Sequence, residues 1–273
     1  MNGKMFSSSR SATRASGTFT RETSGSRSLE RGLHLLSVFR SGASILSNAD
    51  LAARTKVPRP TVSRLTHTLV DAGFLEYDIE NQGYRLTPVF LSLADAYHQN
   101  DSASELALPV MRAVGESERV NVGLALPNML EMVYVASVRE SRNGVFRRAV
   151  PGSRFPIELT SGGRAYLSTL DPAQRDSILD SLRARNEKYE WDGTLQEIQD
   201  ALRRIQDDGY CKAHWQPGMT ALGSPIADLG GRIYSLTISF HTCENLESSV
   251  KRYGEILLKM RAEIKKIWRG CSE

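Results

Sequence analysis

The sequence predicts an α+β protein with two domains, on three observations. The chain has 273 residues, which is more than one typical hydrophobic core accommodates. Its first third shows helical periodicity that ends in a short hairpin pattern, whereas the remainder alternates β-rich runs with helices. Its hydrophobic content of 40% and charged content of 24% are ordinary for a globular protein. We therefore expect a small N-terminal domain and a larger C-terminal domain with a mixed antiparallel sheet flanked by helices.

The N-terminal segment differs from the rest in composition and charge. Residues 1–26 are rich in Ser, Thr, Arg and Gly, and this composition predicts a disordered tail. Residues 1–86 carry twelve Lys or Arg and seven Asp or Glu, so the net charge of +4 arises wholly in this third. A local basic excess is typical of a part that meets phosphates.

Composition also predicts the compartment. No apolar run approaches the roughly 18 residues that span a bilayer, and we expect no membrane association. The start of the chain lacks the apolar segment of a signal peptide. The three cysteines are far apart and form no disulfide framework, so we expect a cytoplasmic protein.

A first helix is predicted over 28–40, with Ser28 as its cap and an apolar stripe of Leu29, Leu33, Leu36 and Phe39. The stretch 47–69 then predicts two short helices joined by a tight turn. Ser47 is a good N-cap, and Asp50 lies where a carboxylate can bond the first-turn amides. Pro58 ends the first helix because it lacks an amide hydrogen and restricts the residue before it. In the second helix the apolar residues at 3–4 residue spacing share one face: Val62, Leu65 and Leu69.

The opposite side of the second helix carries residue types that suit a DNA major groove. They are Arg59, Thr61, Ser63, Arg64 and His67. Arg forms paired hydrogen bonds to guanine, and Thr and Ser bond base edges or phosphates. The alternative is a pair of surface helices whose polar side faces water.

The segment after this helix favours the DNA-binding interpretation. Residues 74–77 predict a strand, 78–83 a turn and 84–86 a return strand. Two helices, their turn and a hairpin together predict a winged helix-turn-helix. The wing residues expected nearest the phosphate backbone are Asn81, Gln82 and Arg85.

A helix that connects the domains is predicted over 87–102. Its apolar residues lie on more than one side, which predicts packing against two neighbours and a part in a dimer contact. The C-terminal domain follows. We expect strands near 120–126, 132–136, 145–150, 210–215, 221–226 and 232–240, and helices near 106–114, 160–170, 171–184, 194–208 and 246–268; residues 151–156 are expected to be irregular.

From about residue 27 onward the chain resembles the IclR family of transcriptional regulators. The matching segments, in the family's order, are Ser28-Leu29-Glu30-Arg31-Gly32-Leu33, Leu46 to Gly73, Gly83-Tyr84-Arg85-Leu86, Leu108-Pro109-Val110-Met111, Val133-Tyr134-Val135, Gly152 to Pro156, Thr160 to Ala165, Gly209-Tyr210, Pro217-Gly218 and Gly223 to Ile226. Each piece is weak by itself. Their order and spacing over some 240 residues carry the resemblance.

The resemblance implies a dimeric DNA-binding half and a GAF-like half that binds a small effector, often assembled as a dimer of dimers. It implies an organic acid or aromatic metabolite as effector, and a double-stranded DNA operator as the other partner. The effector-binding residues that it implies are Met219, Ala221, Thr237 and Ser239. Thr237 and Ser239 lie two apart in a strand and share a face. The alternative is that their hydroxyls face solvent or satisfy backbone groups.

The expected organisation is then as follows: residues 1–26 a disordered tail, 27–86 a winged helix-turn-helix DNA-binding domain, 87–102 a linker helix, and 103–273 a GAF-like effector-binding domain. The chain departs from the family at the effector site, since no acidic residue occurs between Tyr210 and Gly218. The sequence therefore predicts a metabolite-responsive transcription factor and does not identify its effector. Its affinity for DNA should fall as the salt concentration rises.

The sequence also contains residues that would suit two other functions. Cys211, His214, His241 and Cys243 lie on or beside neighbouring predicted strands and have ligand types that suit zinc, although plain buried cysteines are commoner there. Gly162-Gly163 before a helix is a pattern that can seat an anion. The sequence has no nucleophile elbow, Walker loop, HExxH or strand-linked GxGxxG motif, so we expect no enzyme, no cofactor and no metal.

Overall fold

The computed structural model describes residues 25–39, 44–140, 149–185, 190–241 and 245–270. These residues fall into two compact units that meet in sequence between Asp101 and Ser102. The predicted tail, residues 1–26, lies outside the described residues except for its last two. Among the described helices, none combines the length and the apolar character that crossing a bilayer requires.

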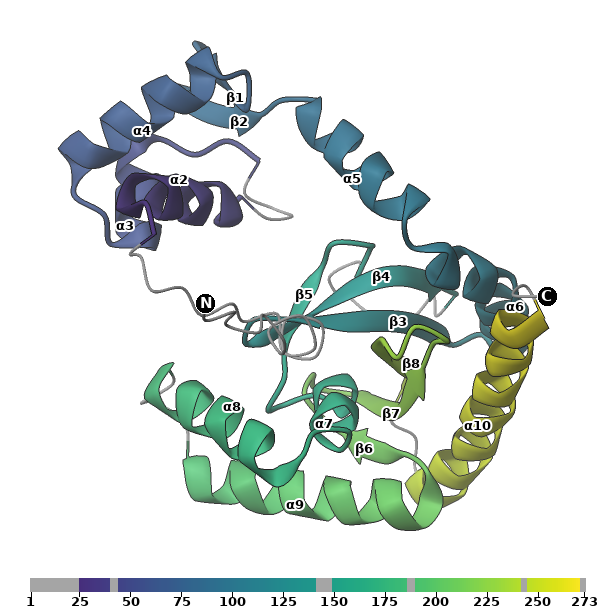
Figure 1. Cartoon of the computed structure of the whole chain (residues 1–273). Helices are drawn as coiled ribbons and strands as arrows, with labels where there is room; N and C mark the ends of the chain where they lie inside the picture. The colour runs from purple at the N-terminus through teal and green to yellow at the C-terminus, as the bar shows by residue number, and fades with distance from the viewer. Residues whose placement is uncertain (1–24, 40–43, 141–148, 186–189, 242–244, 271–273) are drawn as a thin grey trace, which may run out of the picture. The chain divides into compact units, whose positions relative to one another are not determined.

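The first unit contains four helices and a hairpin among its described residues. They are α2 (Arg27–Ser37), α3 (Asn48–Thr55), α4 (Arg59–Asp71), β1 (Leu75–Asp78), β2 (Gly83–Leu86) and α5 (Val89–Gln99) (Figure 1). The core lies between the helices and the hairpin and consists of Leu35, Leu46, Leu51, Val57, Val62 and Leu75. An isolated bridge between Leu46 and Tyr84 ties the segment before α3 to the wing. The predicted winged helix-turn-helix is therefore present.

Helix α2 begins earlier than predicted. Its N-cap is Ser26, whose hydroxyl accepts a hydrogen bond from the Leu29 amide at 3.4 Å, and not Ser28. Both serines precede the apolar run, so local sequence does not distinguish them. The side chains of Leu29 and Leu33, expected in the buried stripe, are 62% and 57% exposed, because Leu35 occupies the core instead.

The second unit is a six-stranded sheet with five helices among its described residues. Its elements are α6 (Ser102–Glu118), β3 (Asn121–Asn128), β4 (Glu131–Arg139), β5 (Arg154–Pro156), α7 (Ser161–Leu167), α8 (Pro172–Arg185), α9 (Trp191–Asp208), β6 (Cys211–Ala213), β7 (Met219–Ala227), β8 (Ile233–His241) and α10 (Leu246–Gly270). The strand order is β5-β4-β3-β8-β7-β6, and the described pairings are antiparallel.

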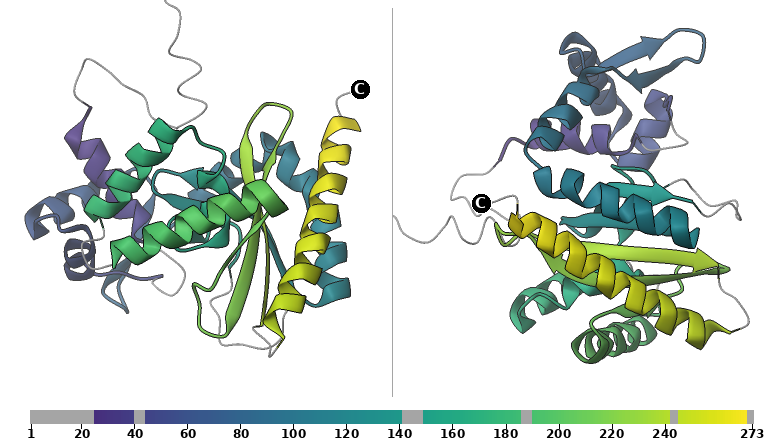
Figure 2. Two further views of the ribbon diagram at one scale, coloured as in Figure 1. Left: turned by 90° about the horizontal axis from the view of Figure 1, so that it is seen from below. Right: turned by 90° about the vertical axis from the view of Figure 1, so that its right-hand side faces the viewer.

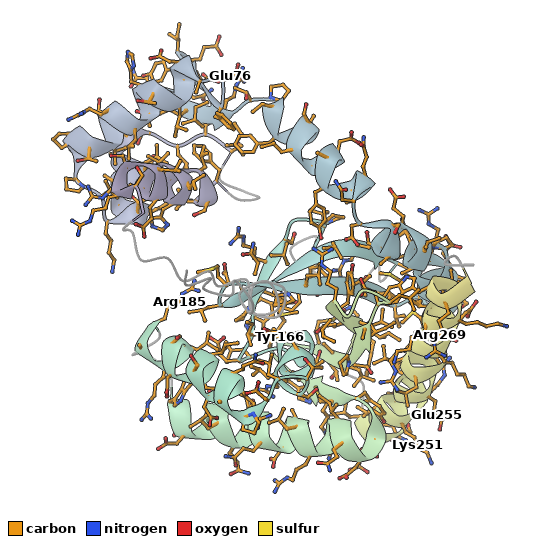
Figure 3. The ribbon with its side chains drawn as sticks, viewed as in Figure 1. Glu76, Tyr166, Arg185, Lys251, Glu255 and Arg269 are labelled. Carbon is orange, nitrogen blue, oxygen red and sulfur yellow. The ribbon has the colours of Figure 1, made fainter. Side chains whose placement is uncertain are left out.

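Different helices pack on the two faces of the sheet. Helices α6 and α10 lie side by side on one face, above a core that includes Met111, Leu236 and Met260 (Figure 2). Helix α7 packs on the other face against β7 and β8 and connects through Tyr166 and Leu182 to the layer of α8 and α9. Figure 3 labels Tyr166 of α7 on this side of the sheet, whereas the labelled charged residues of α10 point away from the sheet.

Three predicted elements have a different outcome in the structure. Residues 154–156, expected to be irregular, form the edge strand β5, because their pairing with β4 is a long-range contact. Helix α9 begins at Trp191, three residues before the predicted start, so Thr194 lies inside it. The strand expected over 145–150 lies mostly outside the described residues, and Ala149 and Val150 belong to no strand.

A β-bulge interrupts the pairing of β3 with β4. Leu124 pairs with Ala136, but the next residue, Ala125, pairs with Tyr134. Val135 is therefore an extra residue on β4. A bulge of this kind shifts the alternation of side chains, and it places Tyr134 on the α7 face with Ala125.

Candidate functional sites: a recognition helix and a sheet face

The start of the helix-turn-helix is fixed by hydrogen bonds between Ser47 and Asp50. The Asp50 amide donates to the Ser47 hydroxyl at 3.2 Å, and the Ser47 amide donates to the Asp50 carboxylate at 3.0 Å. The hydrogen bond from the Ser47 side chain also lowers the pKa of Asp50. This is the capping box that the sequence predicted, and it fixes where α3 begins.

The turn between α3 and α4 depends on Lys56, which has φ 58° and lies in the left-handed region. Thr55, before it, is buried and donates its hydroxyl to the Leu51 carbonyl at 2.6 Å. Pro58 then occupies the N-cap position of α4, and Pro60 lies in its first turn, where a missing amide hydrogen leaves no bond unmade. The left-handed residue was not predicted, since Lys is uncommon in that conformation.

Helix α4 is held to the unit by one side and leaves the other side exposed. Val62 and Thr66 are fully buried, and the Thr66 hydroxyl bonds Asn48 of α3 at 3.3 Å. The predicted DNA-contacting residues lie on the other side: Arg59, Ser63, Arg64 and His67 are exposed and Thr61 is half-buried. Among the residues that the structure describes, no carboxylate pairs with Arg59 or Arg64, whereas His67 lies 2.9 Å from Asp71.

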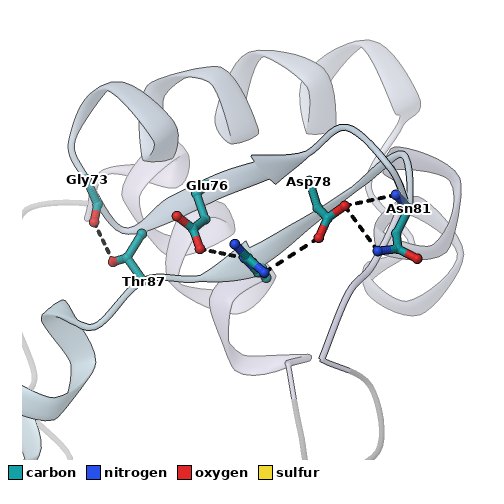
Figure 4. A network of polar contacts seen from close by, with 6 residues as sticks. Gly73, Glu76, Asp78, Asn81 and Thr87 are labelled. Carbon is teal, nitrogen blue, oxygen red and sulfur yellow. Dashed lines mark hydrogen bonds and ion pairs between the residues drawn. The ribbon is translucent and has the colours of Figure 1, made fainter.

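The wing differs from α4 because its polar residues already bond one another (Figure 4). Arg85 contacts Glu76 at 2.5 Å and Asp78 at 3.6 Å across the β1–β2 hairpin. Asp78 also accepts hydrogen bonds from Asn81, from its amide at 2.9 Å and its side chain at 3.1 Å. The backbone hydrogen bond from Asn81 lowers the pKa of Asp78. Two of the three predicted wing contacts, Asn81 and Arg85, are thus engaged inside the wing.

The predicted effector residues lie together on the α7 face of the sheet. Ala221 on β7 pairs with Ser239 on β8, and Thr237 lies two residues from Ser239 on the same face. Met219 is buried two residues before Ala221. Thr237 is also buried, and its hydroxyl donates to the Gly123 carbonyl at 3.2 Å. The Thr237 hydroxyl thus satisfies a backbone carbonyl, which is the alternative role expected from the sequence. Ser239 and Ala221 are half-exposed.

Helix α7 reaches the sheet through small residues. A Cβ on Gly163 would lie 2.1 Å from the Ile157 carbonyl oxygen, and one on Gly162 would lie 3.1 Å from both Phe155 and Thr237. The Gly163 amide is bonded by the Thr160 hydroxyl at 3.1 Å, and Ser235 donates to the Gly162 carbonyl at 2.6 Å. The two glycines therefore allow close packing, and the capped Gly163 amide does not provide the anion seat considered from the sequence.

The four residues considered as zinc ligands do not form a described cluster. Among the described residues, no group of three His, Cys, Asp or Glu side chains is placed to hold a metal, and Cys243 lies outside them. Cys211 is buried, its thiol donates to the Ser161 carbonyl at 3.4 Å, and burial raises its pKa to about 12. His214 is exposed and contacts the Thr220 hydroxyl at 3.1 Å.

Two residues on the same face were not predicted from the sequence. Asn121 on β3 pairs with Ser239 on one side and with Arg139 of β4 on the other. Cross-strand partners in an antiparallel sheet share a face, so Arg139, Asn121, Ser239 and Ala221 form one row across four strands. Strand register is set by long-range pairing, and no local signal in the sequence could have shown this row.

A winged helix-turn-helix in one unit and a helix-covered sheet in the other are the architecture of a two-domain DNA-binding protein. Models of two protein families match the chain. The IclR helix-turn-helix domain matches residues 28–78, and the bacterial transcriptional regulator IclR C-terminal domain matches residues 96–266. The chain belongs to the IclR family of transcriptional regulators.

Individual relatives agree with this assignment. The chain is 25% identical to the Pca regulon regulatory protein of Pseudomonas putida, over 88% of this chain and 83% of that protein. It is 24% identical to the transcriptional regulator BhcR of Paracoccus denitrificans, over 92% and 90%. The solved structure of an IclR-family regulator from Brucella abortus superposes with a TM-score of 0.77 at 27% identity, over 93% and 96%.

A second solved structure shares the fold and contains a ligand. It is an IclR homologue from Microbacterium hydrocarbonoxydans complexed with 4-hydroxybenzoate, with a TM-score of 0.69 and 22% identity over 89% of this chain and 99% of that chain.

Proposed function

We propose that this regulator controls a catabolic operon by binding double-stranded operator DNA through α4, and that a small organic-acid or aromatic effector bound on the α7 face changes that binding. The observation that carries the DNA half is the exposed side of α4, where Arg59 and Arg64 have no carboxylate partner among the described residues. Unpaired guanidinium groups at the start of a recognition helix suit base edges and phosphates.

The proposed DNA contacts are Arg59, Thr61, Ser63, Arg64 and His67 on α4, with Arg85 of the wing. Arg85 already forms ion pairs with Glu76 and Asp78, so a contact with a DNA phosphate would have to replace them. We expect its removal to matter less than that of Arg64, since exchanging one exposed ion pair for another changes the free energy little. The target is chromosomal DNA, so we place the protein in the cytoplasm.

The test is operator binding with purified full-length protein and the DNA upstream of its own gene. Arg59→Ala and Arg64→Ala are each expected to weaken specific binding by about 1–3 kcal/mol, and affinity should fall steeply with salt. Arg183→Ala on α8, an exposed arginine of the other unit, is the matched control and should have no effect. Unchanged affinity in both α4 variants would remove the base-contact assignment.

The effector half of the proposal places the ligand near Met219, Ala221, Thr237 and Ser239. Its support is the half-exposed row beside α7, together with the 4-hydroxybenzoate bound by a protein of the same fold. A regulator of this kind requires the ligand to bind one state of the protein better than another. A ligand that binds tightly and leaves operator affinity unaltered would contradict the coupling.

We also propose that the protein acts as a homodimer that reads an inverted repeat, with a dimer of dimers as the larger alternative. Helix α5 has no buried residue, and its Leu91 and Leu93 are 73% and 54% exposed. Exposed apolar residues gathered on one helix indicate a surface that a second copy covers. Leu91→Glu with Leu93→Glu should lower the mass measured by light scattering; an unchanged mass would exclude α5 from the interface.

A further inference from the structure

The row Arg139–Asn121–Ser239–Ala221 crosses the sheet at the edge of the area that α7 covers. All four residues are half-exposed, whereas Gly123 and Thr237, one position further along β3 and β8 on this face, are buried. Neighbouring strands lie about 4.8 Å apart, so Arg139 and Ser239 are separated by about 10 Å across β3. A small molecule lying over Asn121 would have a cation at one end and a hydroxyl at the other.

Arg139 is held in a fixed position at its end of the row. Its Nε donates to the Ala149 carbonyl at 2.8 Å, and the Ser137 hydroxyl donates to the same carbonyl at 3.0 Å. The guanidinium carbon lies 5.2 Å from the centre of the Tyr134 ring, which in turn packs on Phe155 with ring centres 4.5 Å apart. The guanidinium plane is therefore positioned by a hydrogen bond and by an aromatic ring.

One nitrogen of this fixed guanidinium is left without a partner. Nη2 of Arg139 is buried and makes no hydrogen bond within the described part of the chain, and no described carboxylate forms an ion pair with Arg139. A buried N–H group that makes no hydrogen bond destabilises a protein. Arg164, another arginine on this side of the sheet, differs because it bonds the Glu158 carbonyl at 3.0 Å and the Glu197 carboxylate.

We propose that Arg139 binds the carboxylate of the effector, and that Ser239 bonds a polar group at its other end. This inference rests on the proposed effector response and assigns its chemistry: a small molecule with a carboxylate. A carboxylate matches the fork of a guanidinium and satisfies the buried Nη2 with a charge-assisted hydrogen bond. An uncharged amide of the same shape leaves the cation without an opposite charge.

The experiment compares acids with their amides on full-length protein. The probes are benzoate, 4-hydroxybenzoate and pyruvate, each with the corresponding neutral amide, and the readouts are the melting temperature and operator affinity. At least one acid should raise the melting temperature of the wild type and change operator binding, and its amide should do neither. Arg139→Gln should weaken binding of that acid about 30-fold or more, and Arg139→Lys by less, because it keeps the charge and loses the fork.

Ligand-free protein provides a second readout and a control. Arg154→Gln removes an arginine of β5 that is paired with Glu131, and it should leave acid binding unchanged. Without ligand, Arg139→Gln should melt within about 2 °C of the wild type, since the lost guanidinium contained an unsatisfied group. If Arg139→Gln lowers the melting temperature much more than Arg154→Gln does, Arg139 is a structural residue and the inference is overturned.

Three further outcomes would also overturn it: equal binding of an acid by Arg139→Gln and wild type, equal binding of an acid and its amide, or no response of the wild type to any of the three acids. These outcomes leave operator binding intact, so they are distinguishable from a failure of the proposed function. That failure would appear as wild-type protein that binds no operator in the absence of ligand.

Discussion

The recognition helix and the α7 face of the sheet use the same side-chain types in opposite settings. On α4, Arg64 and Ser63 are exposed and bond no carboxylate of the residues that the structure describes. On the sheet side, Arg164 and Ser235 are buried and bond backbone carbonyls or a carboxylate. An arginine or a hydroxyl therefore indicates a binding site only where the fold leaves its hydrogen bonds unmade. Changes on α4 should reduce affinity, and changes under α7 should reduce stability.

The largest expected effect is the loss of the close packing beneath α7. Gly163→Ala would place a methyl group 2.1 Å from the Ile157 carbonyl oxygen, and backbone atoms must move to admit it. We expect the free energy of unfolding to fall by about 3 kcal/mol or more, measured by urea titration. Gly193→Ala on α9 is the control, since no atom lies within 4 Å of its added Cβ. Equal stabilities of the two variants would show that the α7 contact is easily displaced.

The second largest effect is expected when Arg164 is replaced, and the same replacement of Arg64 provides the comparison. Arg164→Met removes a buried guanidinium and leaves the Glu158 carbonyl without that donor, so we expect a loss of about 2–4 kcal/mol in unfolding free energy. Arg64→Met on α4 should change stability by less than about 0.5 kcal/mol and act on operator affinity instead. Thermal unfolding and operator titration of both variants test this. If Arg64→Met were the more destabilising of the two, the contrast between the units would be wrong.

The smallest effect is a dependence on pH. Burial raises the pKa of the Glu158 carboxyl above its ordinary value of 4.5. A raised pKa means that the folded state binds the proton more tightly, so this stabilising contribution is complete below pH 4.5 and is lost as pH rises through the folded-state pKa. Glu158→Gln should therefore gain melting temperature relative to wild type between pH 4.5 and 7. A difference that stays constant across that range would contradict it.

Local signals made the first unit predictable. Ser47, Asp50 and Pro58 each act within a few residues, and they set the ends of α3 and α4 as expected. The hairpin followed from its alternating residues and turn, and the family resemblance came from the order of short segments. The predicted cap of α2, Ser28, was wrong, because Ser26 and Ser28 offer the same local chemistry and the structure uses Ser26.

The candidate effector site was predictable only in part. Thr237 and Ser239 were placed on one face because strand alternation is local. Their neighbours Asn121 and Arg139 come from strands more than 90 residues away in sequence, and register decides which residues meet. The internal bond of Thr237 to Gly123 depends on the same register. Residue type therefore indicated candidate effector-binding residues, and only the strand pairing showed which of them lack hydrogen bonds within the described part of the protein.

The extra residue Val135 in β4 has a consequence for the changes in chain length that this face tolerates. Counting from Arg139 and Ser137, regular alternation would turn Tyr134 toward α6, and the bulge returns its ring to the side where it lies under the guanidinium. Deleting Val135 would join Tyr134 to Ala136, and regular pairing with β3 would then keep Tyr134 opposite Ala125 on the binding face. Such a deletion would remove only a side chain that packs in the core on the α6 side of the sheet.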